Sequence, residues 1–162
     1  MLSVSEAGKK PVGENTHPSV ADYDGPVYKV LNHLNEFQVS IGETTTNGRV
    51  ELANKNETAL TYDRLMVLGL RRCKTAREAI AEIDRLMQTY GYGSTGETLS
   101  IGDKDEVWLM EIMGKGEEKG GVWVAARVPD GAISAHANMS RITTFPLDDP
   151  KNWLHSEDVI SF

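Results

Sequence analysis

The stretch Glu106–Ile142, EVWLMEIMGKGEEKGGVWVAARVPDGAISAHANMSRI, decides the fold because its pattern predicts three consecutive β-strands. Residues suited to strands fill about 106–113, 121–128 and 132–138, with a glycine-rich loop and a Pro-Asp-Gly turn between them. Strands joined by such short connections pair in the antiparallel direction. We therefore expect an antiparallel sheet built from this stretch.

The third of these strands is expected to end in a polar cluster. The two-residue period of a strand would place His136, Asn138 and Ser140 on one face and small residues on the other. The amide of Asn138 can donate a hydrogen bond to a developing oxyanion, and Arg141 can hold a carboxylate in a bidentate pair. The same side chains would equally serve as caps of neighbouring loops, so the pattern alone leaves both interpretations open.

Upstream, the sequence predicts a β-hairpin with strands at about 27–33 and 38–45. The second strand ends in Glu43, Thr44 and Thr45, which offer one carboxylate and two hydroxyls directly after Gly42. A glycine at that position allows another backbone or a ligand to approach closely. An ordinary polar strand end, placed before the Asn47-Gly48 turn, explains the same residues.

Between the hairpin and the sheet, the sequence predicts two helices, at about 60–73 and 76–90. The second helix has apolar residues at helical spacing and begins with Thr75-x-x-Glu78, the pattern of a capping box. A very short link between the helices predicts an antiparallel pair, which the faces of Trp108 and Trp123 should contact. A strand is expected at about 97–102, before the stretch that begins at Glu106. A further short helix is expected to begin at Ser156.

Composition limits the classes of function. The chain has 162 residues and a net charge of −7, and the acidic balance argues against a nucleic-acid partner bound through its phosphates. No run approaches the ~20 apolar residues of a membrane span, and no histidine or cysteine spacing is typical of a metal site. We expect no membrane partner, no metal and no cofactor. The sequence does not indicate a cellular compartment.

The domain organisation expected from these patterns is simple. Residues 1–25, rich in Gly, Pro, Ser and charge, predict a flexible arm, and residues 26–162 predict a single α+β domain. Cys73, the only cysteine, falls at the C-terminal end of a predicted helix, where the helix dipole disfavours a thiolate. We therefore interpret Cys73 as a structural residue and not as a nucleophile.

Several motifs in this order resemble one family. They are Asn35-Glu36-x-Gln38-Val39-x-Ile41-Gly42-Glu43-Thr44, Lys74-Thr75-Ala76-Arg77-Glu78-Ala79-Ile80, Val122-Trp123-Val124-Ala125, Arg127-Val128-Pro129-Asp130-Gly131 and Ile133-Ser134-Ala135-His136-Ala137-Asn138. Together they are similar to the dipeptidase family of N-terminal-nucleophile cysteine hydrolases, which includes the secernins and is related to bile-salt and penicillin amidases. The resemblance covers about residues 26–162.

The resemblance implies a fold and a chemistry. The fold is an αββα sandwich, of which this chain would form part, with antiparallel sheets packed on the helix pair. The activity is cleavage of dipeptides, with Asn138 matching an oxyanion-hole asparagine of related amidases. Glu43, Thr44 and Thr45 fall where those relatives place another oxyanion or substrate-positioning group, although the residue type differs from their asparagine. Arg141 adjoins the matched motif as a further substrate-binding candidate.

One departure from the family shapes the functional hypothesis. The family's nucleophile is a cysteine that becomes residue 1 after processing, and this sequence has no counterpart of it. We expect the chain to be an interior part of a dipeptidase-like protein, inactive alone, through truncation, a misassigned start or degeneration. The alternative is a non-catalytic α+β module that binds a peptide or a partner subunit. A half-sandwich would expose apolar sheet surface, so a homo-oligomer is also expected.

Overall fold

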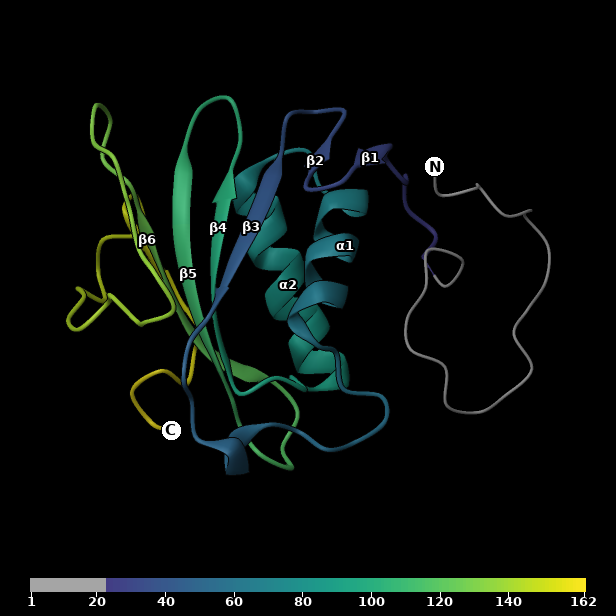
Figure 1. Cartoon of the computed structure of the whole chain (residues 1–162), viewed down its shortest axis with the longest axis vertical. Coiled ribbons are helices and arrows are strands. Elements are labelled where there is room, and N and C mark those ends of the chain that lie inside the picture. The colour runs from purple at the N-terminus through teal and green to yellow at the C-terminus, as the bar shows by residue number, and fades with distance from the viewer. Residues whose placement is uncertain (1–22) are drawn as a thin grey trace.

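Seven strands form one antiparallel sheet, and strands that follow one another in the chain are neighbours in space. The computed structural model describes residues 23–162, and it confirms the expected α+β class (Figure 1). The predicted arm, residues 1–25, lies outside the described residues except for its last three. The strands are β1 (Val30–Leu31), β2 (Leu34–Asn35), β3 (Ser40–Thr45), β4 (Gly96–Gly102), β5 (Val107–Gly114), β6 (Gly121–Arg127) and β7 (Trp153–His155).

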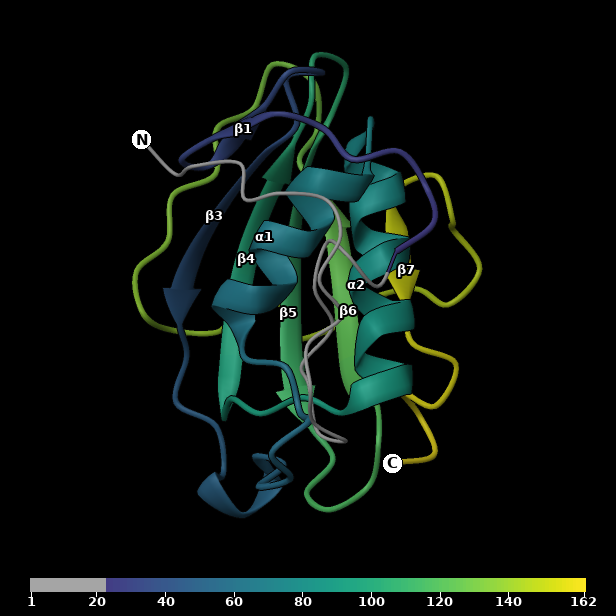
Figure 2. The ribbon, with the colours of Figure 1, turned by 90° about the vertical axis from the view of Figure 1, so that its right-hand side faces the viewer.

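Two antiparallel helices, α1 (Tyr62–Arg72) and α2 (Ala76–Tyr90), cover one face of this sheet (Figure 2). Alternate residues of the central strands point into the layer between sheet and helices, and they include Leu99 and Trp108, both fully buried. Ile83 and Met87 of α2 meet them from the helix side. Both predicted tryptophan contacts are confirmed, since Trp123 is also buried and its Nε1 donates a 2.7 Å hydrogen bond to a carboxylate of α2.

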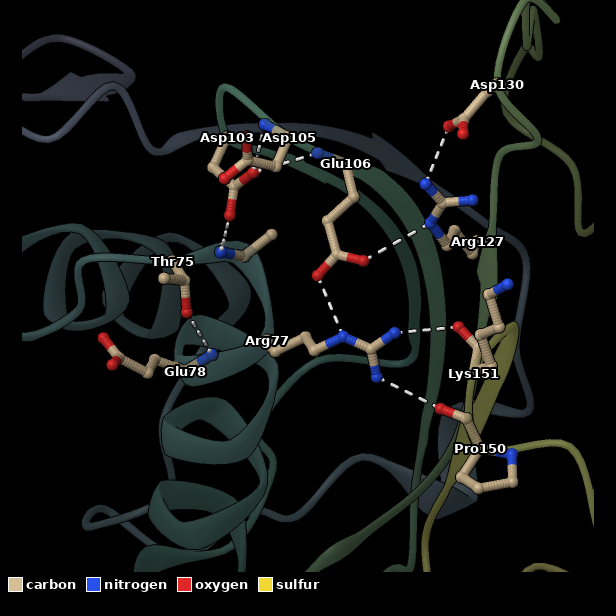
Figure 3. Close-up of polar contacts among 11 residues, drawn as sticks. Thr75, Arg77, Glu78, Asp103, Asp105, Glu106, Arg127, Asp130, Pro150 and Lys151 are labelled. Atoms are coloured by element: carbon tan, nitrogen blue, oxygen red, sulfur yellow. Dashed lines mark hydrogen bonds and ion pairs between the residues drawn. The ribbon is translucent and has the colours of Figure 1, made fainter.

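The start of α2 shows why the sequence specifies this helix so clearly. The hydroxyl of Thr75 accepts a hydrogen bond from the backbone N–H of Glu78, as the capping-box pattern predicted. The Glu78 carboxylate accepts from the backbone N–H of Lys74, one residue earlier than in the usual box. Asp103, from the turn after β4, accepts from the backbone N–H of Ala76 (Figure 3). The cap therefore also joins α2 to the sheet.

The predicted N-terminal hairpin is only partly confirmed. A short pair, β1 and β2, precedes β3, and the strand predicted at about 27–33 does not form as one piece. The chain reverses at Asn32 and His33, because Asn32 adopts a positive φ of 54° and Leu31 pairs with Leu34. The side chain of Asn35 then accepts hydrogen bonds from the N–H groups of Phe37 and Val39 and donates to the carbonyls of Leu70 and Cys73. The backbone turns around this buried amide, which satisfies the otherwise free carbonyls at the end of α1.

Two further predictions are wrong. Residues 132–138 do not form a strand, because β7, which the sequence did not indicate, occupies the edge of β6 that such a strand would need. Ser156 does not begin a helix, and residues 157–161 form turns. Ser156 instead extends the pairing with β6, since its hydroxyl accepts from the N–H of Trp123 and its own N–H donates to the Trp123 carbonyl.

The long β6–β7 connection, residues 128–152, lies along the face of the sheet opposite the helices (Figures 1 and 2). A carboxylate oxygen of Glu111, on β5, accepts hydrogen bonds from the backbone N–H groups of Arg141 and Ile142. Farther along, Phe145 stacks against Trp153 of β7 with ring centroids 6.3 Å apart. No helix within residues 23–162 is long and apolar enough to cross a membrane.

Candidate functional site

The β6–β7 connection is the first candidate for a functional segment. Connections of more than ~15 residues without helix or strand are uncommon in compact domains and are usually functional or linkers. This one is anchored at its base, where the N–H of Arg127 donates to the carbonyl of Asn152 at 2.8 Å. It carries Asn138 and Arg141, both exposed. The structure therefore presents the two predicted residues on one segment held against one face of the sheet.

Asn138 and Arg141 have side chains that are free to meet a ligand. Within residues 23–162, the amide of Asn138 makes no hydrogen bond and the guanidinium of Arg141 makes no ion pair, although the Arg141 backbone is held by Glu111. The expected common face of His136, Asn138 and Ser140 does not exist, because it depended on a strand that does not form. His136 is half-buried, and its Nδ1 has no hydrogen-bond partner.

The end of β3 divides the other predicted residues between two faces. Ile41 points toward the helices, so the strand period turns Glu43 and Thr45 the same way and Thr44 toward the opposite face. Thr44 pairs in register with Thr98 of β4, and both hydroxyls are buried with no hydrogen-bond partner among residues 23–162. Of the three predicted residues, only Thr44 shares a face with the segment that carries Asn138.

Glu97 is a residue that the sequence reasoning missed. It lies on β4 in register with Thr45, is 1% exposed, and its carboxylate oxygens accept no hydrogen bond from residues 23–162 within 3.5 Å. Burial raises the pKa of Glu97 to about 7, and the neighbouring Glu43 carboxyl adds to the rise. The sequence pattern could have indicated this burial, because Glu97 alternates with Leu99 and Ile101 and the strand period therefore turns all three toward the helices.

A cavity of about 210 Å³ opens on the face of the sheet opposite the helices. Its walls are mainly apolar, with Val122 and Val124 from β6, Phe145 from the β6–β7 connection and Phe162 from the C-terminal turns. Glu111 adds a carboxylate to the wall. The cavity therefore borders the segment that carries Asn138, and it is suited to an apolar side chain with a polar neighbour.

Cys73 has the environment of a structural thiol. It is 3% exposed, and burial raises the pKa of the thiol to about 12, with Glu82 and Glu78 contributing further. A thiol with this pKa remains protonated at neutral pH and is a poor nucleophile. Its carbonyl also accepts the hydrogen bond from Asn35 that ends α1. The interpretation of Cys73 as structural agrees with this geometry.

The sequence model of peptidase family C69 matches residues 10–162 of this chain. The chain belongs to peptidase family C69. This is the dipeptidase family of the N-terminal-nucleophile type, so the family expected from the motifs is confirmed.

Curated relatives carry dipeptidase names. The chain is 28% identical over 165 aligned residues to a probable dipeptidase of Latilactobacillus sakei, a match that covers 94% of this chain and 32% of that protein. It is 29% identical over 134 residues to dipeptidase A of Lactobacillus helveticus, covering 80% of this chain and 27% of the relative. Probable dipeptidase B of Lactococcus lactis subsp. lactis (strain IL1403) is 32% identical over 121 residues, a match that covers 74% of this chain and 24% of the relative. The chain spans about a third of the length of these relatives, or less.

Proposed function

We propose that this chain forms part of a cysteine dipeptidase and supplies the side of the active site that stabilises the oxyanion. The observation that carries the proposal is Asn138, whose exposed and unpartnered amide lies on a long, anchored connection in a member of family C69. Cys73 is unsuited to attack a carbonyl, so the proposal takes the nucleophile from polypeptide beyond these 162 residues.

In the proposed reaction, a cysteine thiolate attacks the carbonyl carbon of a dipeptide, and the α-amine of that cysteine accepts the thiol proton. The carbonyl oxygen then carries negative charge, which the amide N–H of Asn138 stabilises. The C–N bond breaks, the departing amine takes the proton that the α-amine had accepted, and water hydrolyses the resulting thioester to release the acid and the free thiol. Among this chain's own residues, Asn138 acts on the reacting atoms.

The remaining predicted residues are proposed to bind substrate. Arg141 would hold the terminal carboxylate of the dipeptide, since its guanidinium is exposed and has no ion pair within residues 23–162. Thr44 lines the same face of the sheet. Glu43 and Thr45 lie on the other face of the sheet from Asn138. They would therefore contact substrate only where it reaches the end of β3.

The αββα sandwich belongs to the same proposal. A second sheet would pack on the face opposite the helices, where the apolar cavity opens and residues 128–152 lie. The cavity also supports a second candidate function, a non-catalytic module that binds an apolar peptide side chain or a partner subunit on this face.

A dipeptide-hydrolysis assay on three proteins tests the proposed function. The 162-residue chain and its Cys73→Ala variant should be inactive, whereas a chain extended by coding sequence that supplies an in-frame N-terminal cysteine should turn over dipeptides. Turnover that survives Cys73→Ala in the 162-residue chain would contradict the proposal, because it would require another nucleophile. Peptide binding without turnover by the extended chain would favour the non-catalytic module.

A further inference from the structure

One carboxylate, that of Glu106, joins two arginines at the end of the sheet where β6 finishes (Figure 3). Its Oε1 lies 2.9 Å from Nε of Arg77, on α2, and its Oε2 lies 3.4 Å from Nε of Arg127, on β6. The Glu106 and Arg127 side chains are only 15% and 16% exposed. The pair with Arg127 is therefore less screened by solvent and salt than the pair with Arg77, whose side chain is 40% exposed.

The two arginines hold opposite ends of the β6–β7 connection. At its start, Nη2 of Arg127 pairs with Asp130 at 2.7 Å, and the N–H of Val128 donates to the carbonyl of Val107. At its end, the guanidinium of Arg77 donates to the carbonyls of Pro150 and Lys151, at 3.1 and 2.8 Å. Glu106 therefore links the side-chain contacts at the two ends of the connection, in addition to the backbone bond from the N–H of Arg127 to the carbonyl of Asn152.

The arginine at position 77 is specific to this arrangement. Its planar guanidinium reaches Glu106 and both carbonyls at once, and it lies over the ring of Trp108 with Cζ 4.6 Å from the centroid. A lysine ammonium could keep the charge pair with Glu106 but lacks the planar fork that serves several acceptors in fixed directions.

We infer that Glu106 is a positioning residue, which sets the path of residues 128–152 and thereby the places of Asn138 and Arg141. The effect of Glu106 on catalysis rests on the proposed function, whereas its effect on the path of residues 128–152 does not. In the middle of the segment, the N–H groups of Arg141 and Ile142 donate to Glu111, and a positioning role of Glu106 requires these two contacts to weaken when the ends are released. A residue that merely pinned α2 to β5 would leave these two amides unaffected.

The chain offers a matched control in Glu82. This carboxylate also lies between two arginines, 2.8 Å from Arg72 and 2.7 Å from Arg85, and its side chain is 13% exposed. It does not take part in the contacts that hold residues 128–152. Glu82→Gln therefore removes a comparable charge pair without touching the connection.

Residue-resolved hydrogen exchange on the 162-residue chain tests the inference. Glu106→Gln should speed exchange at Val128, Arg141, Ile142 and Asn152 by about tenfold, whereas Glu82→Gln should leave all four unchanged. Unchanged exchange at Arg141 and Ile142 in Glu106→Gln, or equal acceleration by Glu82→Gln, would overturn it. Arg77→Lys provides a milder variant that keeps the charge, and it should release Asn152 while Val128 stays protected; protection retained at Asn152 would also count against the inference.

A kinetic measurement on an extended chain that cleaves dipeptides separates an effect on positioning from an effect on the stability of the fold. Glu106→Gln should lower kcat at least tenfold relative to Glu82→Gln, with both variants measured well below their melting temperatures. Equal kcat values in the two variants would contradict a positioning role. If no extended chain cleaves dipeptides, the proposed function fails, and the exchange measurement still decides whether Glu106 holds the segment.

Discussion

At the scale of single residues, Glu97 occupies an environment that carboxylates normally avoid. It is buried on β4, and the groups that face it are Glu43 and Thr45 from β3, Tyr62 from α1 and Tyr92 from the α2–β4 connection, of which only the Thr45 hydroxyl favours the charged form. None of these is a cation. The neutral, protonated acid is therefore the form that the fold favours.

This environment predicts a pH dependence of stability. The folded protein holds the Glu97 proton up to about pH 7, whereas the unfolded chain releases it near the ordinary value of 4.5. The folded state therefore binds more protons in between, so the contribution of Glu97 is complete below pH 4.5 and is lost as the pH rises toward 7. Urea unfolding between pH 4.5 and 8 should show this decline, and Glu97→Gln should flatten it. An unchanged slope in Glu97→Gln, with the exposed Glu57→Gln as control, would contradict this account.

At the scale of elements, Asn35 connects the N-terminal strands to the end of α1. The residue is 4% exposed, and its side-chain amide makes four hydrogen bonds to backbone groups. We expect Asn35→Ala to lower the free energy of unfolding by roughly 2–4 kcal/mol, because two buried carbonyls lose their donor. Chemical denaturation measures this change in the free energy of unfolding. Asn56→Ala, an exposed asparagine that caps a similar turn, should cost less than about 1 kcal/mol; similar losses in both variants would refute the assignment.

The elements that the sequence predicted well are those whose signals are local. Thr75 and Glu78 mark the start of α2 through contacts within one turn, and the strands around Trp108 and Trp123 follow from alternation and turns. The strand expected at 132–138 failed because strand formation depends on a partner edge. The edge of β6 pairs instead with Trp153–His155, which begins more than twenty residues after β6 ends.

For the candidate site, the sequence indicated residue types but not their placement. The polar pattern and the motif resemblance led to Asn138, and Arg141 follows it closely, but their position on a connection without strand structure required the three-dimensional arrangement. The division of Glu43 and Thr45 from Thr44 follows from the strand period once the inward direction of Ile41 is known. Glu106 pairs with Arg77 and Arg127, which lie more than twenty residues away in sequence, so no local pattern could indicate these contacts.

At the scale of the whole molecule, the two faces of the sheet are covered differently. The helix pair covers one face with a continuous apolar layer, whereas the other carries residues 128–152 and an open cavity. Ile133 and Met139 of this connection are 94% and 66% exposed. Exposed apolar residues on a segment that also lines an apolar cavity are typical of surfaces that associate with another chain.

We therefore expect concentration-dependent self-association through this face. Light scattering at increasing concentration should show an average mass above that of a monomer, and Ile133→Asp should lower it. Leu31→Asp is the control, because Leu31 is 76% exposed but lies on β1, at the far edge of the sheet. A monomer at every concentration, or an equal effect of both substitutions, would refute this expectation.

The most direct test of the account concerns Asn138 in a dipeptide-cleaving form of the protein that contains these residues. Because the Asn138 amide has no hydrogen bond within residues 23–162, Asn138→Ala should leave the melting temperature unchanged while it lowers kcat about 10²–10³-fold. The exposed Ser134→Ala on the same segment should leave kcat unaltered. A kcat for Asn138→Ala within a few-fold of the unaltered enzyme would contradict the claim that this segment stabilises the oxyanion.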